Sequence, residues 1–571
     1  MDRDQDARTP DVGEAFVAAL ADRGLDYFFG NAGTDFPAVI EAFARFAAEG
    51  RKCAMPITVP HENTAMGMAY GYYAVTGRPQ AVMVHTTPGT ANAVLGLMNA
   101  ARQNVPILLM AGRTPITEDG QRGSRNRVIQ WAQESFDQAS MLREYVKWDY
   151  ELRSGSQIDD VIDRAWQIAM SEPRGPIYLS LPREVLAQPA SPRPAPGPRA
   201  AATPTRPDAA AIAHAAELIA AAKFPVIVTT TVGRYREAVP LLAKLADAFA
   251  IPVVMNWARF MNLPTEHAMH LGFAPEKVVP QADLVIALDT DVPWTPATEK
   301  PGADVKVVHI GADPLYAAYP MRSFRADLAI AADPALALKD LHEALAAKVK
   351  SGDAGVAARR EKVAALRKAM LADRAALLAK AKVARPLSPA FVTDCVNTIK
   401  DSDTILVNES PVVQDFLRFD TPGQFFSASP VGGLGWGLGT ALGVKLAARD
   451  KTVITCCGDG AYIFGNPTSA HFVSRAHDLP TLTVIYNNRM WAAVSRATKS
   501  MYPNGFAAKS NQAPLTHLEP TPDYEKVVTA SGGHGEQVDS PDDLMPALQR
   551  ALKIVREEKR QAVVNVLTQG V

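Results

Sequence analysis

Short runs of β-branched and other apolar residues alternate along the chain with longer segments that are apolar at helical spacing, such as 12–24. Apolar runs separated by helical segments are typical of parallel α/β sheets. The runs fall into three blocks, which predicts three α/β domains, while the order of the strands within each sheet is not predictable from this pattern. The predicted strands are 26–30, 52–59, 80–85, 106–112 and 176–182; 225–231, 252–257, 283–289 and 305–311; and 404–408, 452–457, 481–487 and 561–568.

Two segments of different composition separate these blocks. Residues 188–207 are rich in proline and poor in large apolar side chains, which predicts an extended linker. Residues 358–386 carry charges of alternating sign at helical spacing, which predicts a long solvated helix and not a nucleic-acid-binding patch. The expected boundaries are an N-terminal domain over 1–187, the linker 188–207, a central domain over 208–350, a helical connector over 351–386 and a C-terminal domain over 387–571.

Composition narrows the class of protein further. The chain of 571 residues exceeds the usual size of one hydrophobic core, and 47% hydrophobic with 21% charged residues is typical of a globular protein. The 59 basic and 60 acidic residues nearly cancel, which gives no reason to expect nucleic acid or a membrane as partner. The four cysteines lack CxxC spacing, the N-terminus is too charged for a signal peptide, and no apolar run is long enough to cross a bilayer. We therefore expect a cytoplasmic protein.

Two predicted strands of the third block end at polar side chains. The run 453–457 is followed by Gly458-Asp459-Gly460, and the run 481–487 is followed by Asn488. Ligands of open α/β sheets bind beyond the carboxyl ends of strands, and glycines let the backbone approach an anion closely. A carboxylate and an amide oxygen suit Mg²⁺, which completes its shell with phosphate oxygens. Asp-Gly is also a common turn dipeptide, so two ordinary turns are the alternative.

Gly-Asp-Gly at one strand end and Asn-Asn at another resemble the signature of the thiamine diphosphate (ThDP) enzymes, and the resemblance extends over essentially the whole chain. It implies ThDP and Mg²⁺ as cofactors. It also implies three parallel-sheet α/β domains: a pyrimidine-binding domain, a Rossmann-like central domain and a diphosphate-binding domain. The implied metal ligands are Asp459, Asn488 and the backbone carbonyl of Met490. The residues implied to border the diphosphate are Gly458, Gly460 and Ala461.

The stretch "TVPHENTAMGMAYGYYAVTG" (58–77) places Glu62 between a strand and an apolar helix. An acidic residue in the first turn of a helix is also favoured by the helix dipole alone. In the family that the chain resembles, a glutamate here hydrogen-bonds the aminopyrimidine ring of ThDP and so helps to ionise the thiazolium carbon. The resemblance implies that Glu62 is catalytic and is buried in a mostly apolar pocket.

The glycine-rich stretch "SASPVGGLGWGLGTALGVKLA" (427–447) supplies two further candidates. In the family, a bulky apolar residue bends the cofactor, and a nearby carbonyl accepts a hydrogen bond from the aminopyrimidine. The resemblance assigns these roles to Leu434 and Gly432. A glycine-rich helix start with one core leucine is the alternative.

Several stretches are most similar to benzoylformate decarboxylase: 28–37, 84–96, 407–410 and 432–444. The similarity implies that His85 and Thr34 face the reacting carbons. A lone histidine at a strand end is more often structural, but histidine suits proton transfer because it titrates near neutral pH. The same similarity places three residues of the 407–410 stretch at the cofactor, namely Asn408, Glu409 and Ser410.

Other stretches depart from the decarboxylase pattern. The second active-site histidine of that enzyme has no counterpart in 287–301, and 114–151 is more similar to acetolactate synthase. Residues 489–512 carry four basic side chains, which suit either a substrate carboxylate or coenzyme A phosphates, or merely form a solvated lid. These basic residues are Arg489, Arg496, Lys499 and Lys509.

The favoured hypothesis is therefore a 2-oxo acid decarboxylase. Its alternatives are an acetolactate synthase-like carboligase, a 2-hydroxyacyl-CoA lyase and, in another class, a non-catalytic binding protein that keeps the fold. FAD or a CoA/ADP nucleotide in the central domain is unsupported, because that domain has no GxGxxG motif. In the family, the two cofactor-binding domains meet across subunits, so the resemblance implies a homodimer or a tetramer.

Overall fold

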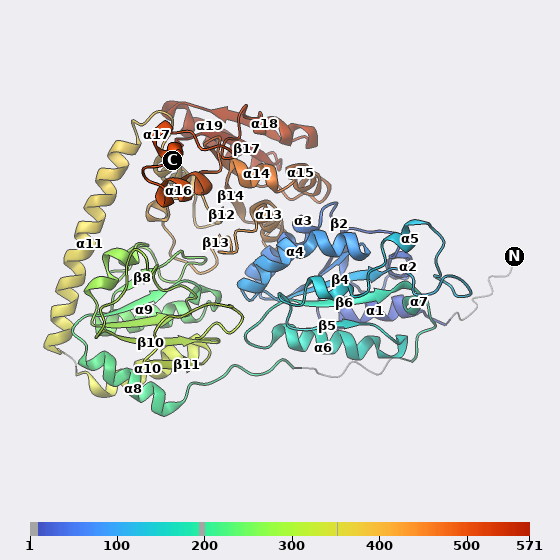
Figure 1. The fold of residues 1–571 in the computed structure, drawn as a ribbon, viewed down its shortest axis with the longest axis horizontal. Coiled ribbons are helices and arrows are strands. Elements are labelled where there is room, and N and C mark those ends of the chain that lie inside the picture. The colour runs from blue at the N-terminus through green and yellow to red at the C-terminus, as the bar shows by residue number, and fades with distance from the viewer. Residues whose placement is uncertain (1–8, 193–199, 351, 571) are drawn as a thin grey trace.

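The computed structural model describes residues 9–192, 200–350 and 352–570. It contains three sheets, in which every strand pairing is parallel, and Figure 1 shows the sheets as three lobes of the molecule. The predicted fold class is thereby confirmed. Part of the predicted linker, 193–199, lies outside the described residues.

The N-terminal sheet has the strand order β2-β1-β3-β4-β6-β5. Its strands are β1 (Tyr27–Gly30), β2 (Met55–Thr58), β3 (Gln80–Val84), β4 (Ile107–Arg113), β5 (Asp149–Glu151) and β6 (Ile177–Pro182). The helices of this part of the chain are α1 (Val12–Asp22), α2 (Pro37–Ala48), α3 (Glu62–Thr76), α4 (Thr86–Arg102), α5 (Ile129–Ala132), α6 (Ile158–Met170) and α7 (Arg183–Leu186).

The central sheet has the order β11-β10-β9-β7-β8. Its strands are β7 (Pro225–Thr229), β8 (Val253–Met255), β9 (Leu284–Leu288), β10 (Lys306–Gly311) and β11 (Leu328–Ala331). Its helices are α8 (Ala209–Ala221), α9 (Ala238–Phe249) and α10 (Pro334–Lys348).

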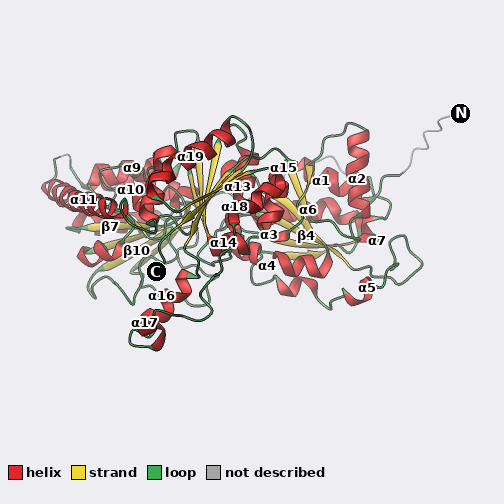
Figure 2. Ribbon diagram, turned by 90° about the horizontal axis from the view of Figure 1, so that it is seen from above, coloured by secondary structure: helices red, strands yellow, loops and turns green. Residues whose placement is uncertain are grey.

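The C-terminal sheet has the order β13-β12-β14-β15-β17-β16. Its strands are β12 (Thr404–Glu409), β13 (Phe425–Ser427), β14 (Thr452–Gly458), β15 (Leu482–Asn487), β16 (His534–Val538) and β17 (Ala562–Leu567). Its helices are α12 (Pro389–Ile399), α13 (Trp436–Ala447), α14 (Asp459–Phe464), α15 (Pro467–Ala476), α16 (Ala492–Met501), α17 (Phe506–Ser510), α18 (Tyr524–Val527) and α19 (Pro541–Arg556). Figure 2 shows helices flanking the strands, with α16 and α17 standing out from the body.

A long helix, α11 (Ala354–Ala381), runs along the side of the molecule from the central to the C-terminal domain (Figure 1). Arg359, Val363 and Ala381 of this helix are buried, Val356, Leu366 and Leu378 pack partly buried against the cores, and most of its other side chains face solvent. Among the described residues, no helix combines the length and the apolar character needed to span a membrane.

The N-terminal and C-terminal domains are joined by the close crossing of α3 and α13, which lie next to each other in Figure 1. Both helices are buried over nearly their whole length. A Cβ added to Gly71 would overlap the carbonyl oxygen of Thr440, and a Cβ added to Gly443 would overlap that of Met68. The backbones can approach this closely only because both helices carry glycine at the crossing.

We expect the substitution Gly71→Ala to destabilise this crossing, because the new methyl group meets backbone that cannot move aside. Overpacking of this kind costs on the order of 1–3 kcal/mol. Calorimetry should show a lower midpoint for the transition of the N-terminal and C-terminal domains. Gly302→Ala is the matched control, since a Cβ there makes only an ordinary contact with Val305. Equal effects of the two substitutions would contradict the prediction.

Candidate active site

The strand ends that carry Asp459 and Asn488 meet at one edge of the C-terminal sheet. β14 and β15 are neighbours, with Gly458 opposite Tyr486. The backbone of Arg489 and Met490 lies close enough to Asp459 to act on the charge of its carboxylate. Asn488 Oδ1 accepts a hydrogen bond from the Met490 N–H at 3.1 Å. The structure therefore brings the predicted metal-binding residues together.

The state of Asp459 fits a bound cation. Its side chain is 2% exposed, and Oδ2 is buried without a hydrogen-bond partner. Burial raises the pKa of Asp459 to about 6, partly offset by hydrogen bonds from nearby backbone N–H groups. A divalent ion would supply the missing partner and stabilise the carboxylate.

The donor set also suits a metal that is shared with a diphosphate. Within the described residues, no group of three or more His, Cys, Asp or Glu side chains could hold a metal ion. Asp459, Asn488 and the Met490 carbonyl would supply one carboxylate, one amide and one backbone oxygen. Mg²⁺ bound there would take its other ligands from phosphate and water.

The glycines beside Asp459 differ in their surroundings. A Cβ on Gly458 would meet no atom, so the space in front of the strand end is open. A Cβ on Gly460 would overlap the ring of Trp491, so this glycine is explained by packing alone. Ala461 is buried at 7% exposure. Contact of these three residues with a diphosphate stays a prediction.

The loop with Gly432 and Leu434 lies between the two domains. Gly432 and Gly435 adopt φ of 70° and 80°, which L side chains rarely adopt. Side-chain amides of the N-terminal domain hold the loop: Asn63 Nδ2 donates to the Leu434 carbonyl at 3.1 Å, and Asn99 Nδ2 donates to the Gly433 carbonyl at 2.8 Å. Leu434 itself is half-buried against the main core.

Glu409, at the end of β12, holds the segment that follows this loop. Its carboxylate accepts hydrogen bonds from the backbone N–H groups of Gly435 at 2.6 Å and Gly437 at 2.7 Å, at the start of α13. Burial raises the pKa of Glu409 to about 7, while these N–H groups favour the charged form. Glu409 thus fixes the segment that carries Leu434. Its predicted contact with the cofactor remains untested.

The neighbours of Glu409 have separate partners. Asn408 Nδ2 donates to Ser427 Oγ at 2.9 Å, and Asn408 Oδ1 accepts from the Val412 N–H at 3.4 Å. Ser410 is exposed and adopts a positive φ of 79°. A cofactor contact for these two residues also stays a prediction.

Glu62 begins α3 and is 7% exposed. Its Oε1 accepts from Asn31 Nδ2 at 2.8 Å, and its Oε2 accepts from Asn92 Nδ2 at 2.5 Å. The expected apolar surroundings are therefore wrong at the carboxylate itself, because amides hold both oxygens. Sequence reasoning missed both asparagines, although each lies in a stretch that carries the family resemblance.

His85 follows β3 and is held at both ring nitrogens. Nδ1 lies 2.5 Å from Asp35 Oδ1, and Nε2 lies 3.1 Å from Gln133 Nε2. The hydrogen bond to Asp35 raises the pKa of His85, burial opposes the rise, and the negative charges of Asp35 and Glu62 add to it. Thr34 is half-buried, and its carbonyl accepts from Arg183 Nη1 at 3.0 Å.

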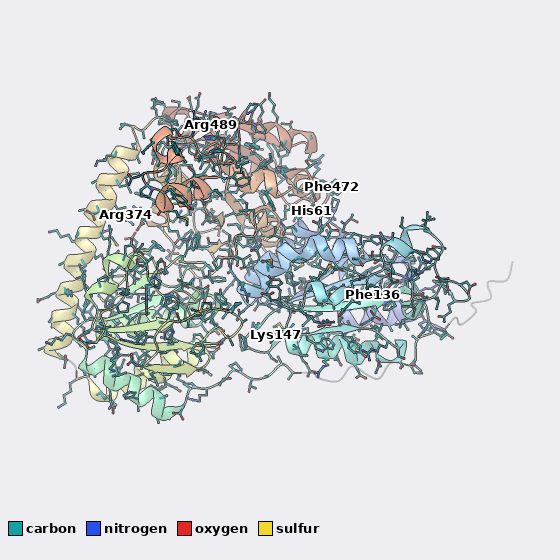
Figure 3. The ribbon with its side chains drawn as sticks, in the orientation of Figure 1. His61, Phe136, Lys147, Arg374, Phe472 and Arg489 are labelled. Atoms are coloured by element: carbon teal, nitrogen blue, oxygen red, sulfur yellow. The ribbon has the colours of Figure 1, made fainter. Side chains whose placement is uncertain are left out.

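The predicted residues thus form two half-sites. The N-terminal half-site, with Glu62, His85 and Thr34, lies at the ends of β1, β2 and β3, which are adjacent in the sheet. The C-terminal half-site contains Asp459, Asn488 and Met490. Within the described part of the chain, no hydrogen bond or ion pair links Glu62 to the C-terminal half-site. Figure 3 marks the half-sites by His61, which precedes Glu62, and Arg489, which follows Asn488; the two labels lie apart.

The central domain offers little support for a nucleotide. At the carboxyl ends of β7 and β9, Arg234 Nη2 lies 3.6 Å from Asp289 Oδ1. Close by, Arg259 Nη2 lies 2.5 Å from Asp291 Oδ2. The two ion pairs lie at the carboxyl ends of the strands, where open α/β sheets bind ligands. The charged side chains at this place therefore already have protein partners. Binding of FAD or a CoA/ADP nucleotide in the central domain therefore remains unsupported.

Comparison with known proteins assigns all three domains. Residues 10–141 match the family described as "Thiamine pyrophosphate enzyme, N-terminal TPP binding domain", 212–341 match its central domain, and 409–566 match its C-terminal TPP binding domain. A sulfoacetaldehyde acetyltransferase of Alcaligenes xylosoxydans xylosoxydans is 26% identical, with 97% of this chain and 92% of that protein aligned. An acetolactate synthase large subunit of Mycobacterium tuberculosis is 27% identical, with 98% and 96% aligned.

Solved structures share the whole fold. Benzoylformate decarboxylase from Polynucleobacter necessarius superposes with a TM-score of 0.78 at 20% identity, covering 98% of both chains. A 4-hydroxybenzoylformate decarboxylase from Rhodococcus jostii RHA1 superposes with a TM-score of 0.75 at 21% identity, covering 98% of this chain and 99% of that chain. At this level of identity, the likeness concerns the fold.

We expect Asp459→Asn to weaken the binding of ThDP with Mg²⁺ at least tenfold, because it removes the only carboxylate of the expected metal shell. Isothermal titration calorimetry with ThDP in excess Mg²⁺ measures the loss. Asp403→Asn, an exposed aspartate of the same domain, should bind as the wild type does. Undiminished binding by Asp459→Asn would exclude Asp459 as the metal ligand.

Proposed function

Because the chain belongs to the thiamine pyrophosphate enzymes, we propose that it is a Mg²⁺-dependent lyase of this family that removes CO₂ from a 2-oxo acid and releases an aldehyde. When bound, thiamine pyrophosphate supplies a nucleophilic carbon and an electron sink. Asp459, Asn488 and the Met490 carbonyl would hold its metal and diphosphate. Glu62 would hold a proton at the aminopyrimidine, and Leu434 with the Gly432 carbonyl would orient the rings.

The His85–Asp35 pair carries this choice of reaction. Loss of CO₂ leaves a carbon that must take up a proton before an aldehyde can leave, and a positioned acid speeds this step. His85 directly follows β3, one strand from the Thr34 loop and two from Glu62. Its side chain is 22% exposed, and the hydrogen bond to Asp35 raises its pKa, which favours a proton on the ring at neutral pH.

Carboligation or acetyl transfer is the second candidate. It is supported by the sequence similarity to acetolactate synthase and sulfoacetaldehyde acetyltransferase. In carboligation, the carbon that loses CO₂ would attack an acceptor carbonyl and take up no proton there. In acetyl transfer, an acetyl group would pass to an acceptor, so neither reaction would release a free aldehyde. A 2-hydroxyacyl-CoA lyase is less well supported, and rests on the basic residues of 489–512. Arg489 lies 3.8 Å from Glu519, and Lys499 donates to Asn511 at 2.8 Å.

We also propose that the two half-sites come together between subunits of a homodimer, or of a tetramer of two dimers. The support is that, within the described residues, the hydrogen-bond partners of Glu62 are Asn31 and Asn92 of its own domain, while apolar side chains next to Asp459 are exposed. On α14 and α15, Ile463 is 45%, Phe464 52% and Phe472 46% exposed. A second copy that covers these side chains would bury apolar area and complete the site.

The function is tested with purified protein, ThDP, Mg²⁺ and a panel of aliphatic and aromatic 2-oxo acids. We expect CO₂ and the corresponding aldehyde in equal amounts. His85→Ala should lower kcat on the order of a hundredfold, since it removes the proton donor, and should leave ThDP binding unchanged. His214→Ala, an exposed histidine of α8, is the control. Formation of acetolactate or an acetyl ester without free aldehyde would contradict the proposal.

A further inference from the structure

The His85–Asp35 pair is built into the N-terminal half-site by two glycines. A Cβ on Gly33 would overlap the ring of His85, and a Cβ on Gly112 would overlap the carboxylate of Asp35. Asp35 is 2% exposed, and its Oδ2 also accepts from the Thr86 N–H at 3.3 Å. Both side chains are thus confined to one arrangement.

This arrangement defines the protonation chemistry of the ring. An ionised carboxylate only accepts hydrogen bonds, so Nδ1 of His85 carries the hydrogen that it donates to Asp35. Nε2 is therefore the atom that gains or loses a proton. The charged groups that act on His85 are Asp35 and Glu62, and Arg183 lies close enough to interact with the charge of Asp35.

Gln133 faces this titrating atom from the loop that follows β4. Its Nε2 lies 3.1 Å from His85 Nε2, a distance at which the amide N–H could donate to the lone pair of a neutral ring. The amide Oε1 of Gln133 is buried and has no hydrogen-bond partner. A half-turn of the amide would exchange the two atoms, and Oε1 would then accept from Nε2–H of the protonated ring.

The position of Gln133 is fixed independently of its side chain. Thr87 Oγ1, in the first turn of α4, donates to the Gln133 carbonyl at 2.8 Å. The backbone of the loop is thereby tied to the same helix that follows His85. The side-chain amide can turn while its anchor stays in place.

We propose that Asp35 and Gln133 are positioning residues for His85. Asp35 keeps the hydrogen on Nδ1, and the Gln133 amide turns over as Nε2 is protonated and deprotonated. His85 then gives its Nε2 proton to the substrate carbon and takes another from water without leaving its place. The inference rests on the proposed function, in which His85 supplies that proton.

The test measures the histidine and glutamine side chains of the full-length protein by NMR, without cofactor or substrate. Comparison with His85→Ala and Gln133→Leu assigns the two signals. We expect the Gln133 NH₂ resonances to move with the same pH midpoint as the His85 ring. In Asp35→Asn, the His85 midpoint should move to lower pH, because the hydrogen bond to a carboxylate is lost. Asp119→Asn is the control: it changes an exposed aspartate of the segment after β4, and the His85 midpoint should stay unchanged.

Kinetics supply the second readout. Asp35→Asn and Gln133→Leu should each lower kcat about tenfold or more, with KM nearly constant. In Asp35→Asn the alkaline limb of the pH profile should move to lower pH, because the proton donor is lost above its pKa. An unchanged His85 midpoint in Asp35→Asn, or Gln133 signals that do not follow His85, would overturn the inference. Gln133→Leu decides the matter if Asp35→Asn does not fold. A failed 2-oxo acid screen with the NMR result intact would refute the proposed function and leave the pairing standing.

Discussion

The close crossing of α3 and α13 is the contact on which the positions of Glu62 and the Leu434 loop depend. Gly67 lies against Gly439, while Gly71 lies against the backbone of Thr440 and Gly443 against that of Met68. The two helix backbones therefore touch, where most helix crossings are separated by side chains. The helices run in the same direction across the contact, which places their first turns side by side. Glu62 stands at the start of one helix, and the Leu434 loop leads into the other. A shift at the crossing would displace both.

Around this crossing, the buried carboxylates are stabilised in different ways. Amides hold Glu62, backbone N–H groups hold Glu409, and an imidazole ring holds Asp35. Asp459 alone among these keeps a buried oxygen without a partner. An uncompensated buried charge is costly, so a cation bound at Asp459 would relieve that cost.

The sequence predicted the interior of each sheet better than its margins. Strands such as β4 and β14 are buried apolar runs, and their positions were found within one or two residues. The missed strands are β5, β11, β13 and β16, all at sheet edges. Three of them are partly exposed, and β13 has only three residues, so none shows a sustained apolar run. Such an edge strand is identified by the strand that it pairs with, and the pattern of residues along the chain does not show this pairing.

The site shows the same division. Residues within short motifs, such as Asp459 and Glu62, were proposed as site residues from the chain alone, and their roles stay predictions. The partners of Glu62 and His85 were missed, because Asn31 and Asn92 reach Glu62, and Gln133 reaches His85, from loops and helices distant in sequence. Asp35 directly follows Thr34, but nothing in its spacing indicates that it pairs with His85. Which side chains meet across loops depends on how the strands are ordered and packed, and the sequence pattern does not show that order.

The central claim is that two half-sites from different subunits make one reaction centre. Mixing two inactive variants, Glu62→Gln and Asp459→Asn, tests it most directly. In each mixed dimer, one site would carry both substitutions and the other site would carry neither. Full exchange of equal amounts makes about half of the dimers mixed, so about a quarter of all sites, and of the wild-type rate, should be restored. No recovery, once native mass spectrometry shows that mixed dimers have formed, would contradict the shared site.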